Sequence, residues 1–312
     1  MSSLPQLLVI VGPTASGKTT LSLAAAQDFH GEIVSCDSVA VYSEFEIGTA
    51  KPTQAERAAV PHHMIDVASP TESFTAGAYA RQARAAVRDI AAEGKLPIVV
   101  GGTGLYLRAL LDGLFPGPER SEDIRARLLA KESSRGKGYL HRLLRRMDAA
   151  AAANIHANDT PKIVRAVEVC LAGREKMSEL WKQGRDPLSG FRIIRVGLDP
   201  ERSQLYDRIN RRCEQMFSDG LIDETRALRD RFPALLSVPN SPLNALGYRQ
   251  AVALIRGELS AAEAISAAQQ AHRNYAKRQL TWFRKEPDVR WVADFGGSAA
   301  ALAAVTQLVG KI

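Results

Sequence analysis

Residues 12–19 read GPTASGKT, which matches the pattern GxxxxGK[ST]. The apolar run Leu7–Val11 comes before the match, and a helical pattern over Thr19–Asp28 comes after it. A glycine-rich loop between a strand and a helix binds phosphate, because backbone N–H groups of the loop and of the helix N-terminus point at the anion. The motif therefore predicts a strand–loop–helix unit, a P-loop, that holds a phosphorylated ligand.

Two side chains of this loop have chemistry of their own. Lys18 supplies a positive point charge, and the Thr19 hydroxyl can ligate Mg²⁺. We expect all eight residues of the loop to contribute to phosphate binding, and they are Gly12, Pro13, Thr14, Ala15, Ser16, Gly17, Lys18 and Thr19.

Three further apolar runs lead into polar or glycine-rich loops, and they are Glu32–Cys36, Met64–Val67 and Pro97–Val100. Such runs are typical of buried parallel strands, and the helical pattern Ala76–Glu93 lies between two of them. This alternation predicts an α/β fold with a doubly wound parallel sheet, in which ligands bind at the carboxyl ends of the strands.

The composition changes after Pro116-Gly117-Pro118, where a helical stretch rich in Arg, Lys, Ala and Leu runs to about Gly190. A strand-like segment, Phe191–Leu198, follows it. We therefore expect the first part of the P-loop core in residues 1–118 and a helical insertion domain in residues 119–190. Residues 191–312 would complete the core and add C-terminal helices.

The chain has 312 residues, of which 41 are Lys or Arg and 34 are Asp or Glu. The net charge of +7 favours a polyanionic partner, and Arg120–Asp148 and Gln270–Arg290 contain most of the basic excess. The three cysteines form no CxxC pair, which argues against a zinc site or a disulfide framework and favours the cytoplasm. No apolar run is long enough to span a membrane.

The ends of two predicted strands differ in their chemistry. Pro97–Val100 leads into Gly101-Gly102-Thr103-Gly104, which has a hydroxyl but no carboxylate, whereas Glu32–Cys36 leads into Asp37. Nucleoside triphosphatases need a strand-end carboxylate for the metal, so Asp37 could organise a metal. It could equally be a general base that faces a second substrate, and the residue pattern alone leaves both roles open.

Six more motifs follow the P-loop, and they are DSVAVYxxxxIGTAKP at 37–52, HHMID at 62–66, GGTGLYLRAL at 101–110, NDxxKxxRAVEV at 158–169, LGYRQ at 246–250 and AKRQLTWFR at 276–284. In kind and order they resemble, over nearly the whole chain, the motifs of the bacterial tRNA dimethylallyltransferase (tRNA isopentenyltransferase) family. The resemblance implies a prenyltransferase that moves a dimethylallyl group from dimethylallyl diphosphate to N6 of the adenine 3′-adjacent to the anticodon. Pyrophosphate is the second product.

The resemblance also implies roles for individual residues. The P-loop, otherwise typical of nucleotide-binding and ATP-binding proteins, would hold the donor pyrophosphate with Mg²⁺ and would not hydrolyse ATP. Asp37 would remove the proton from N6, and Thr103 would help to orient the reacting groups. Arg208 and Arg212 would lie beside the departing pyrophosphate, although an exposed helix face is their alternative interpretation. We further expect a cytoplasmic monomer whose partner is the tRNA anticodon stem-loop.

The tRNA-contacting residues implied by the resemblance lie in four segments, and they are Ser38, Val39, Ala40, Lys162, Arg165, Gly247, Tyr248, Arg249, Lys277, Arg278, Gln279, Thr281, Trp282 and Arg284. Basic and aromatic residues also alternate in Arg273–Lys285, as in proteins that bind single-stranded RNA loops. Aromatic residues at helical spacing are more often core, so we expect Trp282 or Phe283 to be buried. The chain departs from the family pattern at Ala40, Pro161-Lys162 and Asn244.

Three other functions compete with this interpretation. An adenylate isopentenyltransferase would use the same donor on a free nucleotide, but it would not need the basic segments. A small-molecule P-loop kinase is disfavoured because no carboxylate ends the strand before Gly101-Gly102. A non-catalytic RNA-binding regulator would bind nucleotide without forming a product. His62 and His63 lack a matching Cys/His cluster, which favours a structural role at a strand start.

Overall fold

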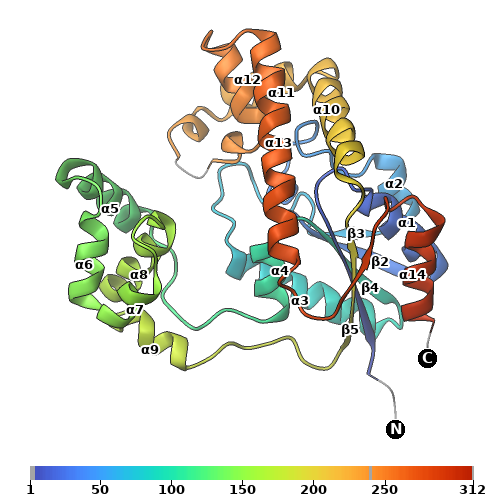
Figure 1. Cartoon of the computed structure of the whole chain (residues 1–312), viewed down its shortest axis with the longest axis horizontal. Coiled ribbons are helices and arrows are strands. Elements are labelled where there is room, and N and C mark those ends of the chain that lie inside the picture. The colour runs from blue at the N-terminus through green and yellow to red at the C-terminus, as the bar shows by residue number, and fades with distance from the viewer. Residues whose placement is uncertain (1–3, 239–240, 311–312) are drawn as a thin grey trace. The chain divides into compact units, whose positions relative to one another are not determined.

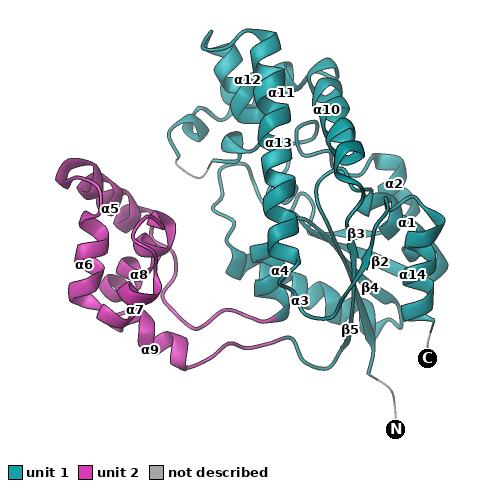
Figure 2. Cartoon of the chain, viewed as in Figure 1, with its two compact units in different colours: residues 1–111, 188–312 teal, residues 112–187 magenta. Residues whose placement is uncertain are grey.

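The computed structural model describes residues 4–238 and 241–310 of the chain (Figure 1). Two compact units divide the chain, one made of residues 1–111 and 188–312 and the other of residues 112–187 (Figure 2). Both boundaries lie a few residues N-terminal of those expected from composition. No helix of the described part is long and apolar enough to cross a membrane.

The first unit is built on a six-stranded sheet in which every pairing between neighbours is parallel. The strand order is β3-β2-β4-β1-β5-β6. The strands are β1 (Gln6–Val11), β2 (Gly31–Cys36), β3 (His62–His63), β4 (Leu96–Gly101), β5 (Arg192–Leu198) and β6 (Val289–Val292). The predicted α/β fold with a doubly wound parallel sheet is confirmed.

One predicted strand is wrong. The run Met64–Val67 is not extended, because Met64 and Asp66 have φ angles of 64° and 57°, in the left-handed region. The short β3 instead consists of His62 and His63 and pairs with Ile33 and Val34 of β2. The two histidines thus stand in the strand, and the apolar residues after them form a turn.

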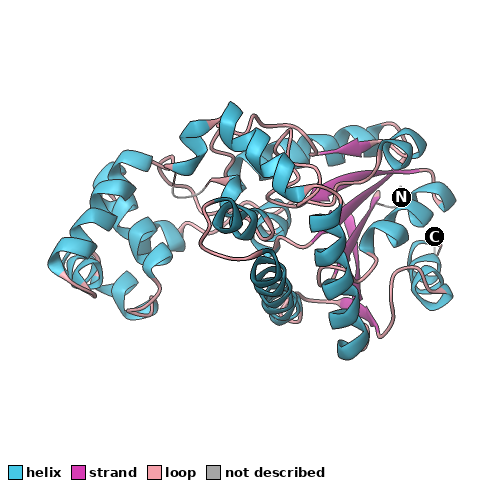
Figure 3. Ribbon diagram, turned by 90° about the horizontal axis from the view of Figure 1, so that it is seen from above, coloured by secondary structure: helices cyan, strands magenta, loops and turns pink. Residues whose placement is uncertain are grey.

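Helices cover both faces of the sheet, as the view from above shows (Figure 3). Leu8 and Ile10 of β1 pack in the cluster that contains residues of α1 (Lys18–Asp28) and α14 (Ala299–Val309). Leu7 and Val9 pack in the opposite cluster, with α3 (Ala76–Ala92) and α4 (Gly104–Leu111). The side chains of β1 therefore alternate between two apolar layers, which buries this central strand on both faces.

The other helices of this unit are α2 (Gln54–Ala59), α10 (Arg202–Ser218), α11 (Leu221–Arg231), α12 (Tyr248–Ile255) and α13 (Ala261–Phe283), with short 3-10 turns at Pro233–Leu236 and Pro242–Asn244. A capping box between Ser260 and Glu263 starts α13, the long helix that contacts α10, α12 and α4. Because α4 follows directly after β4, α13 reaches the carboxyl edge of the sheet.

The second unit is helical throughout its described elements, which are α5 (Glu122–Arg135), α6 (Tyr139–Met147), α7 (Ala149–Asn154), α8 (Thr160–Ala172) and α9 (Met177–Lys182). Its apolar core includes Leu128, Leu144 and Val167. A fully buried carboxylate, Glu168, accepts hydrogen bonds from the guanidinium groups of Arg125 and Arg165. This buried ion cluster joins α5 to α8.

Candidate active site

The P-loop links β1 to α1, as predicted. A Cβ atom at Gly12 would lie 2.9 Å from the carbonyl oxygen of Leu198, and one at Gly17 would lie 2.9 Å from the backbone nitrogen of Gly296. Both residues also have positive φ angles, 151° and 88°. Glycine is therefore required at both positions, by space and by conformation.

Lys18 lies at the start of α1, and its ammonium donates hydrogen bonds to the carbonyl oxygens of Gly12 (3.1 Å) and Pro13 (2.7 Å). Burial, with a smaller contribution from the Arg212 charge, lowers the pKa of Lys18 to about 7, although Asp37 acts in the opposite direction. A bound polyanion would supply the missing negative charge. An anionic ligand in the loop would therefore stabilise the charged form of Lys18.

Asp37 is the first residue after β2. Its Oδ1 atom accepts hydrogen bonds from the backbone N–H groups of Val39 (2.8 Å) and Ala40 (3.1 Å). These bonds fix the carboxylate against its own turn. In the described residues no hydrogen bond is seen at Oδ2, which leaves this oxygen able to accept a proton.

Thr103 lies in the loop after β4. Its hydroxyl oxygen accepts a hydrogen bond from the Ser38 N–H at 3.0 Å, and its own N–H donates to the Cys36 carbonyl oxygen at 3.2 Å. Thr103 therefore supports the turn that carries Asp37. The lining of the adjacent cleft includes Gly101 and Gly102 but not Thr103.

Two arginines come from α10. The Arg212 guanidinium donates to the Thr14 hydroxyl at 3.3 Å, and Arg208 stacks over the Phe295 ring at 4.3 Å from its centre. Both side chains line the cleft with Lys18 and Asp37. Arg212 is half-buried, but Arg208 is exposed, so the alternative of an exposed helix face stays open for Arg208.

The cleft has a volume of about 340 Å³ and lies at the carboxyl ends of β1, β2 and β4. It brings together predicted residues from four sequence regions, which are the P-loop (Thr14, Ala15, Gly17, Lys18 and Thr19), Asp37 with Ala40, the two α10 arginines, and Gln279 of α13. A wider cleft of about 940 Å³ adjoins it and shares Ala50, Lys51, Pro52, Arg208 and Arg212. The two α10 arginines thus stand where the wider cleft meets the cleft of Asp37 and the P-loop.

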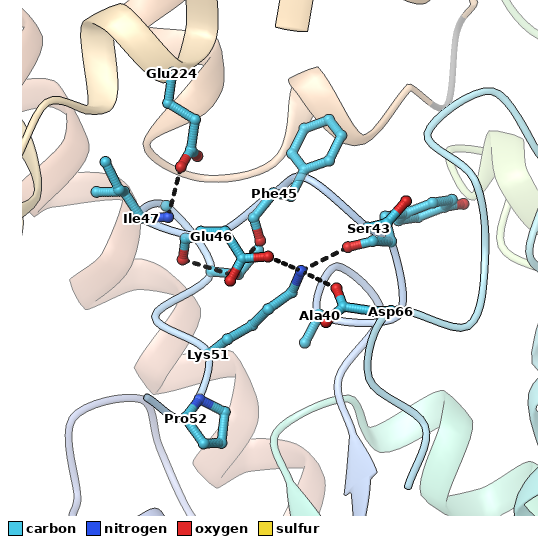
Figure 4. Close-up of polar contacts among 12 residues, drawn as sticks. Ala40, Ser43, Phe45, Glu46, Ile47, Lys51, Pro52, Asp66 and Glu224 are labelled. Atoms are coloured by element: carbon cyan, nitrogen blue, oxygen red, sulfur yellow. Dashed lines mark hydrogen bonds and ion pairs between the residues drawn. The ribbon is translucent and has the colours of Figure 1, made fainter. Parts of the chain in front are cut away.

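An ion network that the sequence did not predict holds the wall shared by the two clefts (Figure 4). The Lys51 side chain is only 1% exposed, and its ammonium donates to Tyr42 O (2.7 Å), Glu46 Oε1 (2.9 Å) and Asp66 Oδ1 (2.5 Å). Burial would raise the pKa of Asp66, but hydrogen bonds from Lys51 and Arg57 lower it. Lys51 stands in the IGTAKP motif, although the motif does not reveal its partners.

The other end of this wall is also anchored. The Ile47 N–H donates to Glu224 Oε2 at 2.9 Å, and the Gly48 N–H donates to the Tyr248 hydroxyl at 3.1 Å. Tyr248 is fully buried and donates in turn to Glu224. Its burial argues against the direct tRNA contact expected for this side chain, because Tyr248 contacts the 46–49 segment instead.

The expected tRNA-contacting residues of α13 lie on different faces of the helix. Lys277, Arg278, Thr281 and Arg284 are exposed, and Arg284 also pairs with Asp199 Oδ2 at 2.7 Å. Gln279 is 5% exposed, and its amide bonds to the Thr14 N–H and to the Gly102 carbonyl oxygen, so its polar atoms already have protein partners. Trp282 is half-buried beneath Arg108, and Phe283 is buried.

The remaining expected tRNA contacts have varied positions. Ser38, Val39 and Ala40 form the turn beside Asp37, and Gly247 and Arg249 flank the start of α12, where Arg249 is exposed. In the second unit, Lys162 is exposed and pairs with Asp159, whereas Arg165 is held by Glu168 and by the Pro118 carbonyl oxygen. Arg165 therefore already has a structural partner.

The described residues contain no group of three or more His, Cys, Asp or Glu side chains placed to hold a metal ion. Thr19 and Asp37 nevertheless line the same cleft. Mg²⁺ in phosphate sites usually has only one or two protein ligands and takes the rest from phosphates and water. The donor set thus fits a metal that arrives with a phosphorylated ligand.

A P-loop at the central strand of a parallel sheet, facing a carboxylate across a cationic cleft, defines an α/β protein that acts on a phosphorylated ligand. The family model described as IPP transferase matches residues 40–286. The chain belongs to this IPP transferase family.

Known proteins similar to the chain cover nearly all of it. The tRNA dimethylallyltransferase of Koribacter versatilis (strain Ellin345) is 61% identical over 305 residues, 98% of each chain. That of Solibacter usitatus (strain Ellin6076) is 53% identical over 292 residues, 94% of each chain. The crystal structure of the full-length tRNA isopentenylpyrophosphate transferase from Bacillus halodurans superposes with a TM-score of 0.71 at 37% identity, covering 98% of this chain and 95% of that one.

Proposed function

We propose that the chain transfers a dimethylallyl group from dimethylallyl diphosphate to N6 of the adenine 3′-adjacent to the anticodon in tRNA and releases pyrophosphate. Membership of the IPP transferase family and relatives named tRNA dimethylallyltransferase support this proposal. The single observation that carries it is the cleft that Asp37 shares with the P-loop. A donor diphosphate and an acceptor amine can meet there.

The donor end of the cleft is suited to a leaving pyrophosphate. The bond between the allylic carbon and the diphosphate oxygen breaks while negative charge grows on the leaving group. Lys18, Arg208 and Arg212 supply positive charge around that group, and the backbone of the P-loop supplies N–H donors. These fixed charges stabilise the transition state more than the ground state.

Magnesium would bind through the Thr19 hydroxyl together with the donor phosphates. When bound, the ion would neutralise charge on the leaving pyrophosphate. Asp37 lines the same cleft, but we assign it to the acceptor amine and not to the metal. Its turn is bonded to the loop of Thr103.

The acceptor amine needs a base, because an exocyclic aromatic amine is a weak nucleophile. As the new bond between N6 and the allylic carbon forms, the N6 proton moves to Asp37 Oδ2. The two backbone hydrogen bonds to Oδ1 keep the carboxylate oriented during this transfer. The adenine must leave its stack to reach a carboxylate at the sheet edge.

The polyanionic acceptor fits the exposed cations of α13. Lys277, Arg278 and Arg284 are available to RNA phosphates, whereas a free mononucleotide would need no such surface. We also propose that the protein works as a monomer in the cytoplasm, where its three free cysteines stay reduced.

The decisive experiment incubates the purified protein with Mg²⁺, dimethylallyl diphosphate and an anticodon stem-loop RNA, and detects the prenylated nucleoside by mass spectrometry. We expect product on the RNA, none on adenosine monophosphate, and none when guanine replaces the target adenine. Product on the free nucleotide alone would favour an adenylate isopentenyltransferase. Phosphate transfer from ATP would favour a kinase.

A further inference from the structure

The side-chain amide of Gln279 connects two loops that leave neighbouring strands. Its Oε1 atom accepts a hydrogen bond from the Thr14 N–H at 2.8 Å, and its Nε2 atom donates to the Gly102 carbonyl oxygen at 3.0 Å. Thr14 follows β1 and Gly102 follows β4, which pair directly through Val11 and Gly101. An amide of this length is needed, since one end must accept and the other must donate.

The helix face that carries Gln279 lies close against the β4–α4 loop. A Cβ atom at Gly102 would lie 2.0 Å from Gln279 Nε2, and one at Gly104 would lie 2.3 Å from Trp282 Nε1. The Tyr275 hydroxyl adds a hydrogen bond to the Gly102 carbonyl oxygen at 3.3 Å. Tyr275, Gln279 and Trp282 occupy one stripe of α13, so this stripe holds the loop while the basic residues lie elsewhere on the helix.

The contacts of Gln279 continue on one side to the phosphate loop and on the other side to the turn of Asp37. On one side, Thr14 also receives the Arg212 guanidinium at 3.3 Å. On the other side, Thr103 follows Gly102 and accepts the Ser38 N–H beside Asp37. Hydrogen bonds from the phosphate loop through Gln279 to Gly102, and from Thr103 to Ser38, are therefore joined by the peptide bond between Gly102 and Thr103.

The same contact selects which P-loop groups remain for the donor. The Thr14 N–H bonds to Gln279, so it is not a phosphate donor in this arrangement. The phosphate must then rely on later N–H groups of the loop and on the cations. The bond to Gln279 thus removes one N–H group of the loop from those available to a phosphate.

We propose that Gln279 is a positioning residue for prenyl transfer, whose amide holds the P-loop and the Gly101–Gly104 loop at a fixed separation. This inference rests on the proposed function, since the separation matters because a donor carbon must face an amine at Asp37. Displacement of reacting groups by about 1 Å can cost about a hundredfold in rate. The role differs from the RNA contact that the AKRQLTWFR motif implies for this residue.

Two substitutions of similar length test the inference. Gln279→Met removes both hydrogen bonds, and Gln279→Glu as a carboxylate removes the donor and places an oxygen against the Gly102 carbonyl. For both we expect kcat to fall by about tenfold or more and the KM for dimethylallyl diphosphate to rise, with the RNA Kd and its salt slope unchanged. The matched controls are Gln270→Met and Gln270→Glu, at an exposed glutamine two and a half turns earlier on α13.

A pH series separates positioning from loss of stability. A protonated glutamic acid both accepts and donates, so it reproduces the pattern of the amide. The kcat of Gln279→Glu relative to the unsubstituted protein should therefore recover as the pH falls, whereas that of Gln279→Met should not. Thermal unfolding of each variant, measured in parallel, identifies a fold defect, which would not produce this recovery.

Several outcomes would overturn the inference. One such outcome is that the kinetic constants of both variants lie within threefold of those of the unsubstituted protein. Another is a tenfold weaker RNA Kd with unchanged donor constants, which would make Gln279 an RNA contact. Calorimetric binding of pyrophosphate keeps the two proposals distinguishable. If the unsubstituted protein forms no prenylated RNA, the proposed function fails. Weaker pyrophosphate binding by Gln279→Met, and not by Gln270→Met, would still support the inference that Gln279 holds the two loops at a fixed separation.

Discussion

The hydroxyl oxygen of Thr103 and the backbone N–H of Ser38 lie 3.0 Å apart and form a hydrogen bond between the β4–α4 loop and the turn of Asp37. Thr103→Val keeps the shape of the side chain but leaves this N–H without its acceptor, so the carboxylate loses part of its orientation. We expect kcat to fall about tenfold with little change in donor KM. Thr103→Ser, which keeps the hydroxyl, serves as the control, and an equal loss in both variants would argue against the hydrogen bond.

Asp37→Ala should lower turnover by about a hundredfold or more and leave donor affinity nearly intact, as expected for loss of a general base. Single-turnover kinetics with saturating donor and RNA measure the chemical step directly. Asp37→Asn retains an oxygen for the two backbone N–H groups and should be similarly slow. Turnover within threefold of the unsubstituted protein would remove Asp37 from the mechanism.

Neutralising Lys277, Arg278 and Arg284 to glutamine together should weaken binding to every RNA sequence alike and flatten its salt dependence. The slope of log affinity against log salt should change by roughly 0.7–0.9 per true phosphate contact. Among the three single substitutions, that of Arg284 should change the slope least, because Arg284 is already paired with Asp199. Filter binding at several salt concentrations provides the measurement, and an unchanged slope would favour a free-nucleotide acceptor.

Glu168 makes the stability of the second unit depend on pH. Burial alone would raise the pKa of this carboxylate, but hydrogen bonds from Arg125 and Arg165 lower it below its usual value. A lowered folded-state pKa contributes stability that is present above the unfolded value and is lost as the pH falls through the folded value. Glu168→Gln should therefore destabilise the protein by roughly 2 kcal/mol near neutral pH.

The difference between Glu168→Gln and the unsubstituted protein should shrink at acid pH, where the native carboxyl is itself protonated. Urea unfolding at several pH values measures the difference in stability. Hydrogen exchange of the α5 and α8 amides assigns that difference to the second unit, residues 112–187. Glu179→Gln is the control, since its carboxylate pairs with Lys182 on the exposed surface. A difference that persists or grows on acidification would contradict this interpretation.

The sequence predicts the parts of the site that depend on strand ends. Lys18 and Asp37 follow apolar runs in the chain, and parallel strands necessarily bring their carboxyl ends to one edge. The strand predicted at Met64–Val67 is wrong because hydrophobic composition does not reveal the left-handed φ angles of Met64 and Asp66. Within this run only Met64 is buried and Val67 is 40% exposed, so apolar composition alone does not establish a buried strand.

Side-chain partners are the part that the sequence does not predict. In AKRQLTWFR a polar residue directly after two cations has the pattern of an exposed group, yet the Gln279 side chain of α13 bonds to the β4–α4 loop. The Lys51 ammonium meets Asp66 across fifteen positions, through a left-handed turn that no periodicity describes. Both arrangements depend on tertiary packing, so only the three-dimensional structure identifies them.

The register of the sheet has a consequence for how this site can change. Val11 of β1 pairs with Gly101 of β4, and Gly101 pairs with Cys36 of β2, so the three loops leave the sheet at one level. Neighbouring strands are about 4.8 Å apart, which places the start of the phosphate loop and that of the Asp37 turn roughly 10 Å from each other. The pairing of the strands therefore fixes the distance between these two loops. Substitutions in the loops can alter the lining of the cleft, but the span between the P-loop and the Asp37 turn is fixed by the pairing of the strands.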